Sequence, residues 1–134
     1  MERLQPLLQA SPAVQLHVAA ALFALLLGVH QFTGRKGSRG HRLVGWTWIV
    51  LLAALCVTSF FITGSLYVGP ISVFHALSVY TLWALYQGAM AARRGEVADH
   101  RSYMSWLFGL SVVVSAVIAV ASGGVLYQVV FPRA

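Results

Sequence analysis

Four runs of about 20 apolar residues follow one another along the chain and constrain its fold more than any other feature. They lie at Pro12–Thr33, Leu43–Gly64, Pro70–Ala92 and Tyr103–Tyr127. Each run is long enough to cross a hydrocarbon core of about 30 Å as a helix, and a helix satisfies its own backbone groups in lipid. The sequence therefore predicts an all-α membrane protein, with one domain over residues 1–134 that forms a four-transmembrane-helix up-down bundle.

The composition and one local motif agree with this prediction. Hydrophobic residues make up 59% of the chain and charged residues 9%, whereas about a quarter of the residues of a soluble domain are charged. Ser11 and Pro12 are typical of an N-cap followed by proline in the first helical position. The first helix is therefore expected to begin at Pro12.

The positive charges cluster between the apolar runs, and this placement predicts the orientation of the helices. The formal net charge is +6. The basic residues between the first two runs or between the last two are Arg35, Lys36, Arg39, Arg42, Arg93, Arg94 and Arg101. Cytoplasmic loops carry such an excess of arginine and lysine, so we expect both loops in the cytoplasm and both termini outside. The charge then indicates anionic lipid of the bilayer, and not nucleic acid, as its partner.

Histidines recur at matching places in the two halves of the chain. His17 begins the first apolar run, and His41 with Arg42 begins the second run 24 residues later. His75 lies near the start of the third run, and His100 with Arg101 begins the fourth run 25 residues later. The bundle is therefore predicted to consist of two helical hairpins that are parallel repeats, related by an axis along the membrane normal.

This register predicts two pairs of histidines at two depths. His17 and His75 each lie about 9 Å outward from the middle of their helices, on diagonal helices, and are the first candidates to bind a haem iron from opposite faces. His41 and His100 form a second pair at the inner interface. Arg42 and Arg101 are candidates to bind haem propionates, because arginine suits carboxylates. His30 has no counterpart in the repeat and is a further candidate ligand.

The sequence leaves other interpretations open. The acidic residues Glu2, Glu96 and Asp99 all lie outside the apolar runs, which disfavours an ion-coupled transporter. His30, His41 and His100 could together form a metal site at the cytoplasmic face. Histidines in membrane helices also serve as interhelical hydrogen bonders, and a small chain of this kind could be a non-catalytic accessory or scaffold subunit of a larger membrane complex.

Two short motifs carry a resemblance to known families. With an early histidine in the first helix, "HRLVG" at His41–Gly45 and "RRGEVADHRSYM" at Arg93–Met104 resemble an uncharacterised family of small four-helix bacterial membrane proteins, described by a domain of unknown function. This resemblance implies a multi-pass protein of the bacterial inner membrane. The layout is more loosely similar to dihaem membrane cytochromes b, including the cytochrome b561 class.

The looser similarity implies a function. It implies one or two haem b groups, electron transfer with quinone, and a place in a respiratory or other membrane complex. If the protein is an enzyme, the similarity implies a membrane cytochrome b oxidoreductase. By position, His17 would pair with His75 and His41 with His100.

Overall fold

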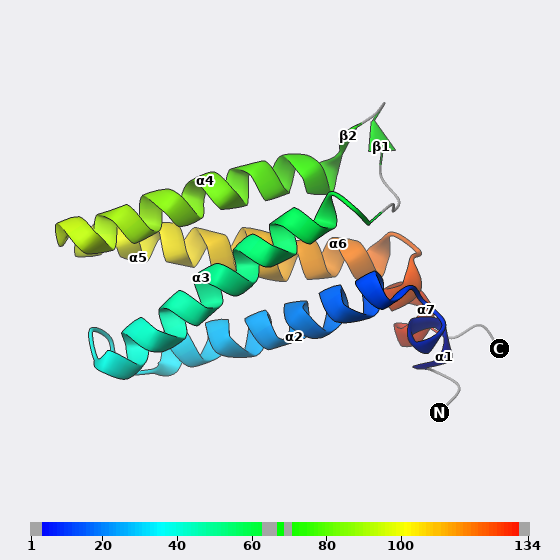
Figure 1. The fold of residues 1–134 in the computed structure, drawn as a ribbon, viewed down its shortest axis with the longest axis horizontal. Helices are drawn as coiled ribbons and strands as arrows, with labels where there is room; N and C mark the ends of the chain where they lie inside the picture. The colour runs from blue at the N-terminus through cyan, green and yellow to red at the C-terminus, as the bar shows by residue number, and fades with distance from the viewer. Residues whose placement is uncertain (1–3, 63–66, 69–70, 132–134) are drawn as a thin grey trace.

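The computed structural model describes residues 4–62, 67–68 and 71–131, and its long helices lie side by side along one axis (Figure 1). In chain order these are α2 (Pro12–Thr33), α3 (Arg39–Ser59), α4 (Val73–Arg94) and the continuous helical segment α5 (Val97–Trp106), η2 (Leu107–Val114) and α6 (Ser115–Ala121). Short elements complete the described chain: α1 (Gln5–Leu8), α7 (Val125–Val130), β1 (Tyr67–Val68) and β2 (Ile71–Ser72).

The bundle has two distinct ends. The turn between α2 and α3 and the turn between α4 and α5 lie at one end, which we call the basic-loop end (Figure 1). The two short helices α1 and α7 and the two-residue strands lie at the other end, which we call the terminal end. The strands pair antiparallel, with Tyr67 opposite Ser72 and Val68 opposite Ile71.

Each long helix begins or ends at a residue whose chemistry explains the boundary. Ser11 caps α2 by accepting a hydrogen bond from the Val14 amide at 3.4 Å, and α2 has the predicted bounds. Ser38 caps α3 in the same way from the His41 amide at 3.1 Å, so α3 begins four residues before the predicted Leu43. Gly95 ends α4 with a φ of 76°, a left-handed conformation that glycine adopts readily.

The other predicted boundaries need correction. The helix expected over Leu43–Gly64 ends at Ser59, and the one expected from Pro70 begins at Val73, although Gly64 and Pro70 themselves lie outside the described residues. The last helix begins at Val97, because it follows directly on the Gly95 turn. It ends at Ala121 and not at Tyr127, because Gly123 has a φ of 76° and separates α7 from it.

Three helices in the described part of the chain are long and apolar enough to cross a membrane. They are Pro12–Thr33, Arg39–Ser59 and Val97–Ala121. α4 has 22 residues but is not among them, because polar side chains such as Thr81 and Gln87 interrupt its apolar sequence. The chain is thus a helical membrane protein with three candidate spans.

The core lies between the helices along the middle of the bundle. Its buried members come from every long helix and are Ala24, Trp48, Leu52, Ala84, Leu85, Leu107 and Val112. The small residues of α2 do not leave open space there. Ala24 accepts the Trp48 hydrogen bond, and a side chain at Gly28 would overlap the Phe108 ring. The middle of the bundle is therefore filled by protein side chains.

Candidate functional site

His17 is held by a hydroxyl of the neighbouring helix at the terminal end. Its Nδ1 lies 3.0 Å from Thr58 Oγ1, and the Thr58 hydroxyl donates its hydrogen to the Ala54 carbonyl oxygen at 2.9 Å. Because that hydrogen is already used, Nδ1 of His17 is the donor in this pair. A neutral His17 then carries its lone pair on Nε2, which is the form in which histidine binds metals.

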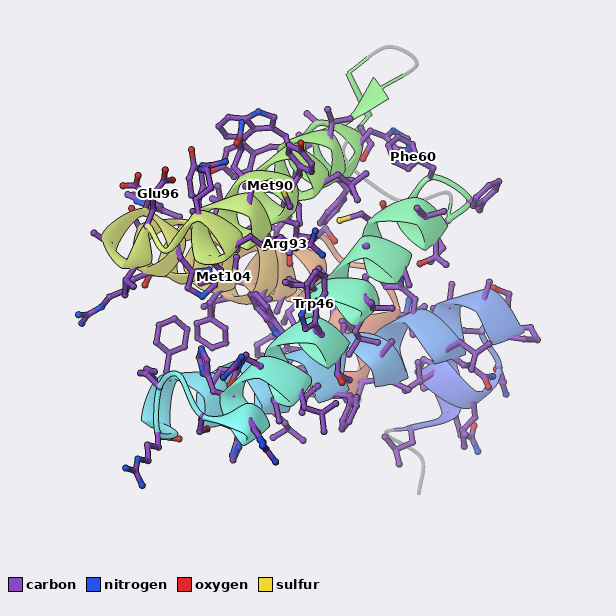
Figure 2. All side chains as sticks on the ribbon, turned by 60° about the vertical axis from the view of Figure 1, so that its left-hand side comes forward. Trp46, Phe60, Met90, Arg93, Glu96 and Met104 are labelled. Carbon is purple, nitrogen blue, oxygen red and sulfur yellow. The ribbon has the colours of Figure 1, made fainter. Side chains whose placement is uncertain are left out.

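His75 lies at the same end of the bundle, but its Nδ1 accepts a hydrogen bond, whereas Nδ1 of His17 donates one. Its Nδ1 accepts a hydrogen bond from the Ser72 amide at 3.0 Å and so completes the cap of α4. The ring stacks on Phe60, with centroids 4.9 Å apart and planes at 17°; Phe60 lies at the end of α3 (Figure 2). A neutral His75 therefore carries hydrogen on Nε2. The structure brings His17 and His75 to the same end of α3. Of these two, only His17 has its lone pair on Nε2, the form in which a histidine oriented through Nδ1 binds a metal.

His41 presents an unsatisfied nitrogen to the interior near the basic-loop end. It lies on the face of α3 that also carries the buried Trp48 and Leu52, seven and eleven residues later. Its Nδ1 is buried and has no hydrogen-bond partner among the described residues. Such an atom is uncommon, because burying a polar group without a partner is unfavourable.

His100 is oriented by a carbonyl of α4 at the same end. Its Nδ1 lies 2.9 Å from the Gly88 carbonyl oxygen. A carbonyl only accepts, so Nδ1 carries the hydrogen, and a neutral ring has its lone pair on Nε2. Gly88 permits this close approach, because a side chain there would meet Met104 and Tyr103. His41 is the third residue of α3 and His100 the fourth of α5, so both lie near the basic-loop end.

The remaining candidates lie on the surface. His30, Arg42 and Arg101 are exposed. No group of three His, Cys, Asp or Glu side chains in the described residues lies close enough to hold one metal ion. His30, His41 and His100 are therefore not assembled into the three-ligand site that was one alternative.

The basic-loop end carries one ion pair among the described residues. Arg94 donates to Glu96 twice, from Nε to Oε1 at 2.9 Å and from a terminal nitrogen to Oε2 at 2.8 Å. This pairing lowers the pKa of the exposed Glu96 carboxyl. Glu96 thus neutralises Arg94, and the other arginines of this end keep their charges for other partners.

Hydroxyl pairs inside the bundle are polar contacts that sequence reasoning did not find. Thr81 Oγ1 lies 2.6 Å from Ser111 Oγ and joins α4 to η2. Ser59 Oγ lies 2.7 Å from Ser78 Oγ and joins α3 to α4. The signal that could have revealed them is serine and threonine within long apolar helices, where such groups hydrogen-bond across helices.

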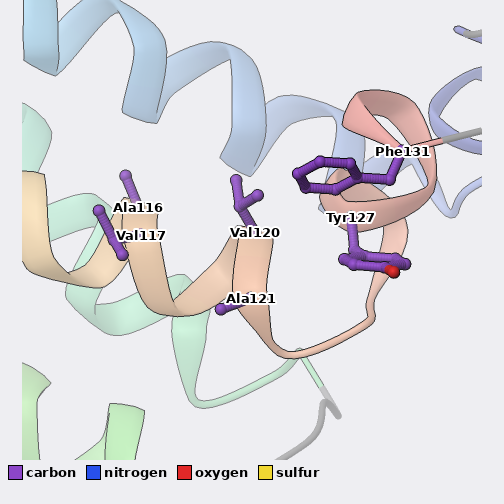
Figure 3. Close-up of a pocket in the computed structure, with 6 residues that line it drawn as sticks. All are labelled: Ala116, Val117, Val120, Ala121, Tyr127 and Phe131. Atoms are coloured by element: carbon purple, nitrogen blue, oxygen red, sulfur yellow. The ribbon is translucent and has the colours of Figure 1, made fainter.

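Two hollows on the bundle surface are apolar. One lies at the terminal end (Figure 3) and is lined by Ala116, Val117, Val120, Ala121, Tyr127 and Phe131. The other lies between α2 and α3 and is lined by Phe23, Leu43, Trp46, Thr47, Val50, Leu51 and Ala54. No histidine lines either hollow.

Three long apolar helices of membrane-spanning length in the described chain are typical of helical membrane proteins. Within this class, a family model described as "Predicted membrane protein (DUF2306)" matches residues 14–122. The chain belongs to this family, as the sequence motifs predicted. No curated protein and no solved structure matches the chain.

Proposed function

We propose that this chain is a b-type haem protein that transfers electrons within a membrane, and that His41 and His100 are the residues that would hold the haem. The observation that supports this most directly is the buried, unpartnered Nδ1 of His41. A group that binds His41 would remove the cost of that unsatisfied atom. His100, from the helix diagonal to α3, has its Nε2 lone pair available.

The donor set favours haem over a bare ion. A bare zinc ion is almost always held by three or four protein ligands, and the described residues offer no cluster of three. Two imidazoles would be sufficient to hold a haem, because its porphyrin provides the remaining ligands of the iron. The α2–α3 and α4–α5 hairpins also diverge toward the basic-loop end (Figures 1 and 2).

The chain's own residues would prepare this site in three ways. The Gly88 carbonyl fixes the ring orientation of His100, which is the usual role of a second partner for a metal-binding histidine. Trp48 and Leu107 exclude water on the interior side, since both are buried. Arg101, at the same end, would pair with a propionate. Haem iron, when bound, supplies one-electron redox chemistry, and quinone is the partner that we propose.

The same proposal includes the topology of the chain in the bacterial inner membrane. α4 would be a fourth span, because it packs beside α3 and α5 and its 22 residues reach about 33 Å. The basic-loop end would face the cytoplasm, and both termini would face outward.

Absorption spectra of the full-length protein, produced with sufficient haem and purified in detergent, test the proposal. We expect a Soret band in the wild type, and its loss in His41→Ala and in His100→Ala. His30→Ala is the matched control, because that ring is exposed. If the band is lost only in His17→Ala and His75→Ala, the haem binds at the terminal end, and the assignment to His41 and His100 is wrong. A wild type without a band would refute haem binding and favour an accessory subunit.

A further inference from the structure

The hollow between α2 and α3 has the length and the surroundings of a lipid site. We call it the α2–α3 groove; it is a hollow of about 480 Å³ that is largely open along the outer surface of the two helices. From Leu43 to Ala54 it follows α3 for about 17 Å, close to one leaflet, which is half of a hydrocarbon core of about 30 Å. An acyl chain from one leaflet would therefore fit along it.

The groove offers apolar contacts along its length. Val50 and Phe23 are 64% and 50% exposed, so neither is covered by another part of the described chain. The one polar residue of the lining, Thr47, donates its hydroxyl hydrogen to the Leu43 carbonyl oxygen of its own helix at 3.0 Å. The groove therefore favours an aliphatic chain, which requires no hydrogen bonds.

Three arginines surround the end of the groove that lies nearest the basic-loop end. Arg39 and Arg42 are exposed and lie four residues before Leu43 and Trp46, on the adjoining turn of the same helix face. Arg93 reaches Trp46 from α4, with its guanidinium carbon 5.5 Å from the ring centroid (Figure 2). No acidic residue in the described chain pairs with these three, since the ion pair of this end joins Arg94 to Glu96.

We propose that the α2–α3 groove binds one anionic glycerophospholipid, with an acyl chain along Phe23, Trp46 and Val50 and its phosphate against Arg39, Arg42 and Arg93. The charge selects the headgroup, because arginine binds phosphate in a bidentate manner and each basic residue near an anionic membrane surface adds to the attraction. The length of the apolar groove matches an acyl chain that stays in one leaflet. This site is independent of the histidines.

Native mass spectrometry of the full-length protein, released from nanodiscs of phosphatidylcholine with a minor share of phosphatidylglycerol, tests the proposal. We expect one retained phosphatidylglycerol per chain. The double variant Arg39→Gln with Arg42→Gln should weaken its retention on the order of thirtyfold. Arg35→Gln, which removes one charge from the turn outside the groove, is the control, and it should retain the lipid.

Variants of the apolar wall separate a bound lipid from attraction to phosphate alone. Val50→Trp fills the groove and should abolish retention, whereas Val50→Ala enlarges it and should keep retention. Val79→Trp, which adds the same bulk on the exposed face of α4, controls for folding. Equal retention of phosphatidylcholine, equal loss in Arg35→Gln, or unchanged binding in Val50→Trp would each overturn the proposal. Detection of a second copy of the chain in place of the lipid would also overturn the proposal.

Discussion

The indole Nε1 of Trp48 donates a hydrogen bond of 2.9 Å to the Ala24 carbonyl oxygen. Trp48 is 4% exposed and Ala24 is fully buried, so this bond joins α3 to α2 in the interior of the bundle. Ala24 has no side chain beyond Cβ to hold the indole away from the backbone. The fit of a large aromatic residue against a small one thus fixes the contact between the first two long helices.

Replacing Trp48 by phenylalanine should destabilise the bundle. The variant loses the hydrogen bond and leaves a cavity, and we expect a loss of about 1–3 kcal/mol in the free energy of unfolding. Unfolding by denaturing detergent, followed by circular dichroism, measures it. Trp46→Phe is the matched control, because Trp46 is 46% exposed and should cost little. Equal effects of the two substitutions would show that the buried bond has no special role.

A methyl group at Gly28 should conflict with the helix that faces it. The added Cβ would overlap the Phe108 ring and lie 3.3 Å from Trp48 Nε1, so Gly28→Ala should destabilise the protein by about 1–3 kcal/mol. Thermal unfolding in detergent measures the change. A second substitution, Phe108→Leu, should recover part of the loss. Gly109→Ala should be neutral or better, because nothing lies within 4 Å of a Cβ there.

Removing the Thr81 hydroxyl should weaken the contact between α4 and η2. Thr81 donates to the Leu77 carbonyl oxygen at 2.7 Å, and its oxygen also lies 2.6 Å from Ser111 Oγ. Interhelical hydrogen bonds in membranes average about 0.6 kcal/mol, with a maximum of about 1.7, and Thr81→Val should fall within this range. A double-mutant cycle with Ser111→Ala isolates the pair, and a coupling energy of zero would contradict the assignment.

His75 should act through the cap of α4. His75→Ala removes the acceptor of the Ser72 amide, and we expect a loss of about 0.5–1 kcal/mol in stability. His75→Gln should restore most of it, because glutamine at this third helical position reaches back to the same amide. Unfolding and haem content are measured together. A protein that keeps its stability but loses its haem in His75→Ala would show that His75 is a ligand.

The bounds of α2 were predictable because its start depends on local chemistry. Ser11 and Pro12 marked the start of α2, and long apolar runs marked the interiors. The sequence predicts a later start for α3, because Arg39 and Arg42 are typical of a loop. In the structure Ser38 caps a helix that includes both arginines. The end at Ala121 depends on Gly123, which has a positive φ and lies between Ser122 and Gly124, although apolar residues resume at Val125.

The candidate site was less predictable, because sequence spacing gives the depth of a histidine but not its hydrogen-bond partner. The register predicts His17 and His75 at one level, and each ring contacts a residue at the end of α3. It could not reveal that the Ser72 amide binds His75, or that Gly88 orients His100. The Gly88 partner follows from helix packing, which places α4 against α5, whereas the Ser72 partner belongs to the local cap at the start of α4.

The π-helical segment η2 has a consequence for the rest of the last helix. Leu107 and Val112 are both buried although five residues separate them, a spacing that a π-helix places on one side and an α-helix does not. A π-helix takes more residues per turn than the 3.6 of an α-helix, so α-helical geometry over the same eight residues would rotate α5 relative to α6. The π-helical geometry of η2 therefore sets the rotational phase of the whole helix, and with it the direction in which His100 points.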